Sequence, residues 1–234
     1  MYFFNLCKKF RTSNESEFKK ESIYKNKPSR VLILTDLHHD VPSEHFRLLE
    51  NLEYDVCLLL GDIRPSNLRQ IKNIIPSDKL YGVLGNHDDL DLYQKYDIKE
   101  LSINEPTYIK GEESNLSIIG LSGSYRYKKC NQCMITQEES LEKCKTAPDE
   151  FDLFVSHDYP VNFYDPEYLD DAHPGLEGIN YILNSENHPE VMLHGHSHRE
   201  SVGTYKGLHG NTTVIELYGC SLIELKEKKI QKIF

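Results

Sequence analysis

Carboxylates, an amide and histidines occur in short clusters whose side chains could together hold metal ions. Asp36 and His38 stand two residues apart, directly after an apolar run that begins at Val31. Side chains alternate between the two faces of a strand, so Asp36 and His38 should point to the same side. An oxygen donor and a nitrogen donor that converge in this way form half of a metal site. Alone the pair is weak support, because Asp-x-His arises by chance in many chains.

Four more apolar runs end in residues of the same kinds. They lead into Gly61-Asp62, Gly85-Asn86-His87-Asp88, His157 and Gly195-His196-Ser197-His198. Oxygen ligands mixed with imidazoles suit Mn²⁺, Fe or Zn²⁺, and the lack of thiolates among them argues against a structural zinc site. The alternative is a set of buried polar residues that hydrogen-bond at strand ends without a metal. Each additional cluster makes that alternative less favoured.

The elements that must position these residues alternate between strand and helix in the first part of the chain. Apolar runs predict strands at residues 31–34, 56–60 and 80–84, and amphipathic or polar spacing predicts helices at 42–52 and 67–75. This alternation predicts right-handed crossovers and a largely parallel sheet. Ligands of open α/β sheets bind at the carboxyl ends of the strands, which is where the clusters lie.

The second part of the chain contains more strand and less helix. We predict strands at residues 116–121, 151–155 and 191–194, and helices at 136–144 and 175–183. Thr136 and Glu139 have the spacing of a capping box at the start of the first of these helices. Short alternating segments at 213–217 and 221–225 indicate antiparallel closing strands.

The clusters, taken in order, resemble the pattern of the calcineurin-like metallophosphoesterase superfamily: Asp-x-His, Gly-Asp, Gly-Asn-His-Asp/Glu, a lone His, and Gly-His-x-His. Every block of that pattern is present between residues 36 and 198, so the resemblance covers most of the chain. It implies an α/β fold, a four-layer α/β/β/α sandwich of two mixed sheets with helices outside and a dinuclear metal centre at one end. We expect a single domain over residues 30–234, preceded by a polar extension over 1–29.

The resemblance also implies roles for individual residues. One ion would be held by Asp36, His38, Asp62 and His198, and the other by Asp62, Asn86, His157 and His196, so that Asp62 bridges them. We expect two divalent or trivalent ions, Mn²⁺ first, with Fe or Zn²⁺ as alternatives. A hydroxide that bridges the ions would attack a phosphate ester in line.

His87 is the expected catalytic residue, either as proton donor to the leaving oxygen or by stabilising transition-state charge. The protein phosphatases of the superfamily extend Gly-Asp to Gly-Asp-x-x-Asp-Arg-Gly, and that second Asp orients the catalytic His. Pro65 occupies its position here, so another group must orient His87, with Asp88, Asp89 and a backbone carbonyl as candidates. This departure disfavours a protein phosphatase.

A phosphodiester or cyclic nucleotide is therefore our preferred substrate, with a phosphomonoester as the alternative. A second alternative is a scaffold that binds partners without catalysis, like one retromer subunit of this superfamily. Asn86, Asp170 and His173 are candidate substrate contacts, although a solvated loop would equally explain the last two. Cys130 and Cys133 could bind zinc, but an ordinary surface pair is favoured because a fourth ligand is missing.

Composition limits the classes of protein and partner. The chain of 234 residues has 38% hydrophobic and 27% charged residues, which is ordinary for a globular protein. The net charge of −10 argues against a broad nucleic-acid interface, while bound metal ions would still allow a phosphate-bearing substrate. The apolar runs are too short for a membrane span. Six scattered cysteines fit reduced thiols, and we expect a cytoplasmic protein.

Overall fold

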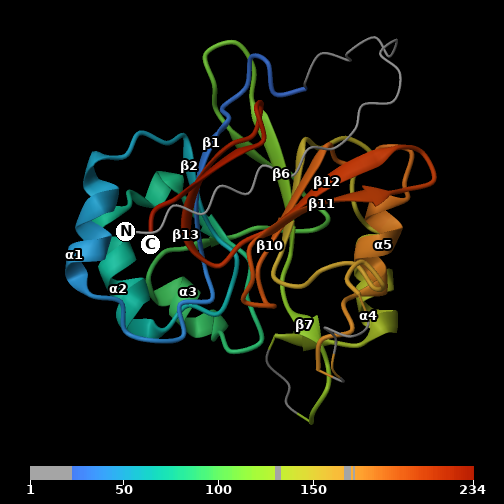
Figure 1. The fold of residues 1–234 in the computed structure, drawn as a ribbon, viewed down its shortest axis with the longest axis horizontal. Coiled ribbons are helices and arrows are strands. Elements are labelled where there is room, and N and C mark those ends of the chain that lie inside the picture. Colours follow the sequence, from blue (N-terminus) through green and yellow to red (C-terminus); the bar gives the residue numbers. More distant parts are fainter. Residues whose placement is uncertain (1–22, 130–132, 166–169, 171) are drawn as a thin grey trace.

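The fold has four layers in the computed structural model, which describes residues 23–129, 133–165, 170 and 172–234. Two six-stranded sheets pack face to face, and helices cover both outer faces (Figure 1). The helices on one side are α1 (Ser43–Arg47), α2 (Pro65–Ile74) and α3 (Leu90–Lys95), and those on the other are α4 (Gln137–Cys144) and α5 (Glu177–Leu183). Short 3₁₀ turns follow at Leu48–Asn51 and Ser77–Lys79. The predicted α/β/β/α sandwich is confirmed.

The first sheet is parallel in the part that the sequence predicted. Its order is β14 (Lys229–Lys232), β13 (Gly219–Glu224), β1 (Arg30–Thr35), β2 (Val56–Leu59), β3 (Leu80–Gly82) and β4 (Lys99–Glu100). Strands β1 to β4 run parallel to one another, whereas β13 is antiparallel to both β1 and β14. The helices between the parallel strands lie on the outer face, as expected for crossovers.

The second sheet combines parallel strands with two antiparallel edges. Its order is β11 (Ser201–Lys206), β12 (Asn211–Glu216), β10 (Val191–His194), β9 (Leu153–Ser156), β6 (Leu116–Leu121) and β5 (Thr107–Ile109). The predicted antiparallel closing strands are correct only in part, because β12 is parallel to β10 and antiparallel only to β11. A separate pair, β7 (Ser124–Tyr125) and β8 (Met134–Ile135), lies beyond β6.

Alternation along the strands divides the apolar residues among three cores. In β1, Val31 and Ile33 face the central core between the sheets, whereas Leu32 and Leu34 face the helices. The central core also contains the buried Tyr24, whose hydroxyl donates to the carbonyl of Asp152 at 2.8 Å. Residues 1–22 of the predicted extension lie outside the described residues. Its last part packs on the domain, so the folded region begins before Arg30.

The start of α4 follows the capping chemistry of the sequence. Thr136 Oγ1 accepts a hydrogen bond from the Glu139 N–H, and the Glu139 carboxylate accepts one from the Thr136 N–H. This confirms the capping box at the start of α4. None of the helices in the described part of the chain has both the length and the apolar character of a membrane span.

Candidate metal centre

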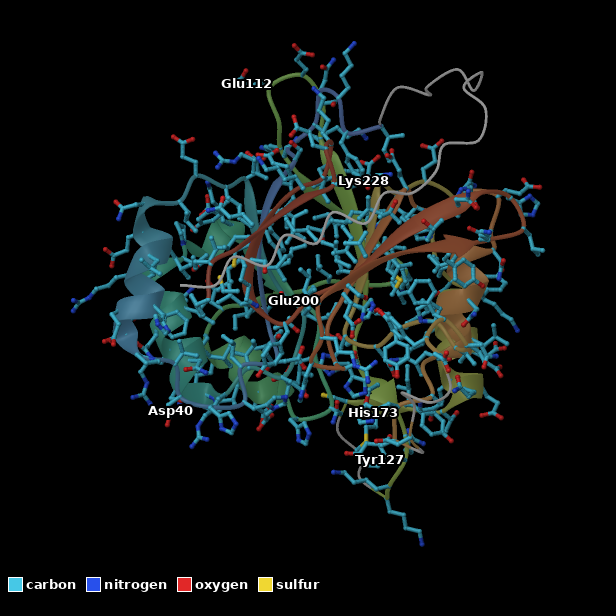
Figure 2. All side chains as sticks on the ribbon, in the orientation of Figure 1. Asp40, Glu112, Tyr127, His173, Glu200 and Lys228 are labelled. Atoms are coloured by element: carbon cyan, nitrogen blue, oxygen red, sulfur yellow. The ribbon has the colours of Figure 1, made fainter. Side chains whose placement is uncertain are left out.

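The predicted ligands meet at one end of the sandwich although they come from both sheets. Asp36 and His38 follow β1, Asp62 follows β2 and Asn86 follows β3, all in the first sheet. The second sheet supplies His157 after β9 and the two histidines of the Gly-His-x-His block after β10. Figure 2 shows Asp40 and His173 at this end of the molecule, whereas Glu112 and Lys228 mark the other end. The carboxyl ends of the parallel strands thus share one edge.

The first group of ligands is Asp36, His38 and His198. Their ligand atoms all lie within 4.8 Å of one another, and Nε2 of His198 is 3.4 Å from Oδ1 of Asp36. Oδ2 of Asp36 accepts hydrogen bonds from Thr35 Oγ1 at 2.7 Å and from the backbone N–H of His196 at 3.0 Å. Oδ1 is buried and has no hydrogen-bond donor within the described residues. A bound cation would satisfy a buried carboxylate oxygen in that state.

The second group is Asp62, His157 and His196, and all three side chains are buried. Oδ2 of Asp62 lies 3.4 Å from Nε2 of His157 and 3.8 Å from Nε2 of His38, so this carboxylate stands between the two groups. Oδ1 of Asn86 is 3.2 Å from Nε2 of His157. Nε2 of His196 is buried without a hydrogen-bond partner in the part of the chain that the structure describes. A second cation beside this nitrogen would give it a partner.

A backbone carbonyl determines which nitrogen of His157 faces the centre. Nδ1 of His157 is 2.7 Å from the carbonyl of Leu60, which can only accept, so Nδ1 is the donor. Nε2 is then the atom available to a metal, and the carbonyl fixes the orientation of the ring as partners of metal-bound histidines do. The residues present therefore fit metal ligation on their own geometry.

The electrostatics of the second group favour positive charge beside the Asp62 carboxylate. Burial alone would raise the pKa of Asp62, but the charge and hydrogen bond of His157 hold it well below its usual value. Burial would lower the pKa of His157, yet the Asp62 and Asp36 carboxylates raise it to about 10. Burial and then the charge of His157 hold the pKa of His196 far below its usual value. A cation at this position would replace the proton of His157.

Four of the ligand residues have left-handed backbone. The φ angles are 55° for Asp36, 57° for Asp62, 77° for His196 and 57° for His198. Such angles are unfavourable for residues with a Cβ atom and persist where surrounding structure enforces them, commonly at functional sites. The sequence gives no sign of this conformation. The left-handed backbone means that the turns after β1, β2 and β10 adopt locally unfavourable conformations where they carry these side chains.

Two glycines permit the close approach of the turns that carry the ligands. A Cβ atom on Gly85 would lie 2.2 Å from Oδ1 of Asp62, and one on Gly61 would lie 2.6 Å from Nδ1 of His157. Gly61 also has a φ of +96°. Both positions therefore require glycine if Asp62 and His157 are to keep their places.

His87, the expected catalytic residue, is exposed at the edge of the centre. Its backbone N–H donates to Oδ1 of Asp62 at 2.8 Å, and its ring lies edge-on to the ring of His38 at 5.5 Å between centroids. The two carboxylates considered for orienting it have other partners. Asp88 accepts from the N–H groups of residues 62, 63 and 85, and Asp89 caps α3 by accepting from the N–H of Asp91. No described residue donates to or accepts from the His87 ring.

The candidate substrate contacts His173 and Asp170 do lie beside the centre. The ring of His173 packs against the ring of His196 at 4.6 Å between centroids. Nδ1 of His173 is 2.6 Å from Oδ1 of Asp170, so the carboxylate holds the imidazole in place. Tyr159 adds a hydrogen bond from its hydroxyl to the carbonyl of His173 at 2.5 Å. These contacts place an imidazole next to the second group of ligands.

Only one member of the cysteine pair lies within the described residues. Cys130 lies outside the described residues, and Cys133 is a half-buried free thiol. Burial raises the pKa of Cys133 to about 12, with the nearby carboxylates Asp88 and Glu100 adding to the effect. A thiol with so high a pKa is a poor nucleophile and a poor metal ligand.

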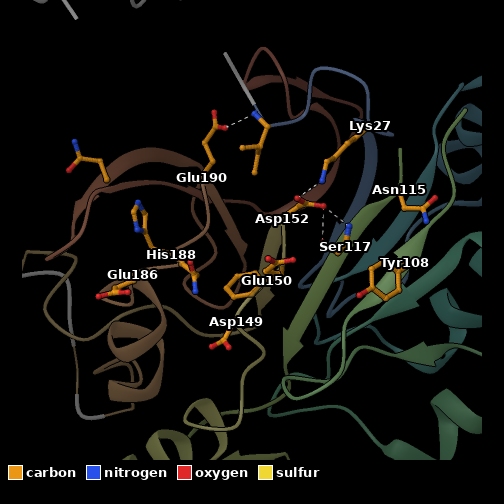
Figure 3. Close-up of a pocket in the computed structure, with 14 residues that line it drawn as sticks. Lys27, Tyr108, Asn115, Ser117, Asp149, Glu150, Asp152, Glu186, His188 and Glu190 are labelled. Carbon is orange, nitrogen blue, oxygen red and sulfur yellow. Dashed lines mark hydrogen bonds and ion pairs between the residues drawn. The ribbon is translucent and has the colours of Figure 1, made fainter. Parts of the chain in front are cut away.

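A cavity of about 740 Å³ lies at the end of the sandwich opposite the candidate metal centre (Figure 3). It is lined by residues at the amino ends of β6, β9 and β10, among them Ser117, Asp152 and Glu190. Asp152 accepts from Lys27 at 2.5 Å and from both the N–H and the hydroxyl of Ser117 at 2.8 Å. Its carboxylate joins residues 23–29 to the second sheet, and none of the candidate metal ligands lines this cavity.

Comparison with known proteins assigns the chain to a family. The profile of the calcineurin-like phosphoesterase superfamily domain matches residues 30–216. No curated protein matches the sequence significantly.

Solved structures share the fold at low sequence identity. One aligns with 87% of this chain and 98% of its own at a TM-score of 0.59 and 16% identity. The phosphopantetheinyl hydrolase of Mycobacterium tuberculosis aligns with 83% of this chain and 90% of its own, with a TM-score of 0.51 and 10% identity. A Staphylococcus aureus protein described as a 5′-nucleotidase aligns with 83% of this chain and 50% of its own, with a TM-score of 0.50 and 15% identity. With the profile match and the ligand geometry, these findings show that the chain belongs to the calcineurin-like phosphoesterase superfamily.

Proposed function

We propose that this protein hydrolyses phosphate esters, phosphodiesters in particular, with two metal ions bound between the sheets. The observation that carries the proposal is the pair of candidate ligand groups that meet at Asp62, each with one buried atom that has no hydrogen-bond partner among the described residues. The proposed ligands are Asp36, His38, Asp62, Asn86, His157, His196 and His198. Hard oxygen donors mixed with imidazoles suit Mn²⁺, Fe or Zn²⁺, and Mn²⁺ is our first choice among them.

Ions held there would activate water as the nucleophile and balance the charge of the phosphoryl oxygens. The chain's own residues position the substrate around them. His87 is exposed at the edge of the centre and takes the role of contact to the phosphoryl group or the leaving oxygen. His173, held by Asp170, offers a second imidazole from the side of His196.

Two small pockets that meet at His38 support a diester rather than a monoester. One, of about 230 Å³, lies toward Val41 and Tyr218, and the other, of about 200 Å³, lies toward Arg64 and His87. A phosphodiester carries two organic groups, and a phosphate placed beside His38 would direct one group into each pocket. A monoester would leave one pocket without a group.

The proposal also covers the location of the protein and the size of its substrate. The four cysteines within the described residues, Cys57, Cys133, Cys144 and Cys220, are free thiols, which fits the proposed cytoplasmic location. The net charge of −10 disfavours long nucleic acids as substrates, because they would be repelled over most of the surface. Small phosphodiesters, including nucleotide-type and cyclic ones, remain the proposed class.

The test is hydrolysis of bis-p-nitrophenyl phosphate and of p-nitrophenyl phosphate by the protein with added Mn²⁺. We expect turnover of both, with the larger kcat/KM for the diester, and a loss of at least about 100-fold in Asp62→Asn. Asp149→Asn, an exposed carboxylate beside the far cavity, is the matched control and should keep full activity. Absence of turnover with Mn²⁺, Fe²⁺ and Zn²⁺ would overturn the enzymatic proposal, and a preference for the monoester would overturn the diester assignment.

A further inference from the structure

We propose that the pocket between His38 and Tyr218 binds an aromatic ring in the organic part of the phosphate ester. The inference rests on the proposed function and names the substrate group that the site selects. This ring pocket is lined by Leu37, His39, Val41, Tyr218, Gly219, Lys232 and Phe234, together with Asp36 and His38.

The ring pocket is continuous with the metal centre. Asp36 and His38 line it and belong to the first group of ligands. On its far wall, the ring of Tyr218 lies 5.4 Å from the ring of His198, the third member of that group. A phosphate bound at the centre therefore has the mouth of the pocket beside it, within reach of a group attached by one ester bond.

The walls of the ring pocket are mainly apolar and are held in place by packing. Phe234 stacks on His45 at 5.4 Å between centroids with 18° between the planes, and meets the edge of Phe46 at 5.7 Å. Nζ of Lys232 lies 5.6 Å from the centroid of the Tyr218 ring and donates to the carboxylate of Glu200. The only cation of the pocket walls among the described residues is thus engaged with a carboxylate, which disfavours a second phosphate in this pocket.

Gly219 lets the backbone next to Tyr218 approach the backbone of Phe234. It has a φ of +74°, and a Cβ atom there would lie 2.6 Å from the carbonyl oxygen of Phe234. The strand β13 therefore leaves Tyr218 directly against the last residues after β14. Tyr218 and Phe234 both line the pocket, and contacts of a planar ligand with aromatic side chains add to the free energy of apolar burial.

The volume of the pocket limits its occupant to one group of a substrate. At about 230 Å³ it is smaller than the roughly 300–1,000 Å³ of pockets that enclose whole drug-sized ligands. A single aryl ring or nucleobase is small enough for this pocket, and both are flat groups with a π face. The shared chemistry is a planar ring joined to the phosphate, whichever of these supplies it.

The experiment is calorimetric titration of the Mn²⁺-loaded protein with phosphonates, which are not hydrolysed. Phenylphosphonate, cyclohexylphosphonate and methylphosphonate carry the same charged group and differ only in the organic part. We expect phenylphosphonate to bind about five- to tenfold more tightly than methylphosphonate, with cyclohexylphosphonate in between. Since the readout is binding, it does not depend on turnover.

Two variants act on the pocket in opposite ways. Phe234→Ala removes one wall, and Val41→Phe fills the space while the backbone N–H of Val41 keeps its bond to Oδ1 of Asn67. Both should bring phenylphosphonate to the affinity of methylphosphonate and leave the binding of methylphosphonate unchanged. Tyr108→Ala, an aromatic residue that is 60% exposed beside the far cavity, is the matched control and should keep the difference.

The outcomes separate this inference from the proposed function. Equal affinities for phenyl- and methylphosphonate in the unaltered protein, or a phenyl preference that survives both pocket variants, would overturn the ring pocket. Cyclohexylphosphonate binding as tightly as phenylphosphonate would show an apolar pocket without preference for a planar ring, and would overturn the aromatic assignment. Failure of the hydrolysis test with an intact phenyl preference would overturn only the enzymatic proposal.

Discussion

The two carboxylate oxygens of Asp62 have different partners. Oδ1 accepts the N–H of His87, while Oδ2 faces one histidine of each ligand group. Asp36 belongs to the first group alone, because its Oδ2 is used by Thr35 and by the backbone of His196. A change at Asp62 should therefore affect both ions, and a change at Asp36 mainly one.

Metal analysis of the purified variants tests this difference. Asp36→Asn should retain about one ion per chain, and Asp62→Asn should retain fewer, since an amide bridges two cations poorly. Asp89→Asn, whose carboxylate only caps α3, should keep the metal content of the unaltered protein. Equal losses at Asp36 and Asp62 would contradict the bridging assignment.

His194 illustrates a buried histidine that serves the site without facing it. Nε2 accepts from the Tyr164 hydroxyl and Nδ1 donates to the carbonyl of Gly195, both at 2.9 Å, so the neutral ring is fully bonded. Burial lowers the pKa of His194 to about 4 from its usual 6.5. The unfolded chain therefore binds a proton at a higher pH than the folded protein does. The stability that His194 contributes is present above pH 6.5 and is lost as the pH falls toward 4.

Urea unfolding of metal-free protein between pH 7 and pH 4.5 measures this effect. The unfolding free energy of the unaltered protein should fall by about 2 kcal/mol more than that of His194→Gln. Other groups titrate in the same range, but they are common to both proteins, so the difference isolates His194. Parallel curves for the two proteins would show that burial of this ring has no such consequence.

At the scale of elements, Asp88 joins the turns after β2 and β3. Its Oδ2 accepts from the N–H groups of Asp62 and Gly85 at 2.8 Å, and its Oδ1 accepts from that of Ile63 at 3.0 Å. Three buried donors thus depend on one carboxylate. The side chain that follows the Gly-Asn-His motif is therefore structural, and it fixes the distance between the two turns that carry Asp62 and Asn86.

Replacing Asp88 by Asn should destabilise the protein by about 2 kcal/mol, because an amide keeps one acceptor and turns an N–H₂ group toward a buried donor. Chemical unfolding measures the change. Asp89→Asn is the matched control on the next residue, and it should cost less than about 0.5 kcal/mol because Asn caps a helix as well as Asp does. Similar effects of the two changes would contradict the role given to Asp88.

The sequence predicted elements well where one local signal decides them. The apolar runs before Asp36, Asp62 and His157 indicated β1, β2 and β9, and Thr136 with Glu139 indicated the start of α4. The sequence could not predict which sheet each closing strand joins, because β12 and β13 have similar alternating residues but belong to different sheets. That choice depends on long-range packing.

The site followed the same division between local and long-range information. The motif blocks, read through their resemblance to the superfamily, named all seven proposed ligands, and the fold brings their atoms together at one edge. Spacing could not show the left-handed backbone of Asp36 and Asp62. Nor could it show that the His87 ring has no hydrogen-bond partner among the described residues, or that Tyr218 and Phe234 line the pocket beside His38. These depend on contacts between segments that lie far apart in the chain.

For the whole molecule, the candidate metal centre lies at a junction between the two sheets. Asp36 and Asp62 come from turns of the first sheet, and His157 and His196 from turns of the second. Ions bound there would join the two halves of the sandwich, in which a central apolar core is otherwise the main contact. Metal binding should therefore stabilise the entire fold rather than a local loop.

Thermal unfolding with and without Mn²⁺ tests this linkage. An ion that binds the folded protein alone stabilises it by about 2.7 kcal/mol at 100 times its dissociation constant, so the midpoint should rise by several degrees. The rise should be absent in Asp62→Asn and unchanged in Asp149→Asn. A rise of equal size in Asp62→Asn would show that Mn²⁺ acts by screening the net charge of −10, and would contradict the junction. Since screening depends on total charge, these two variants, which each remove one carboxylate, separate it from ligation.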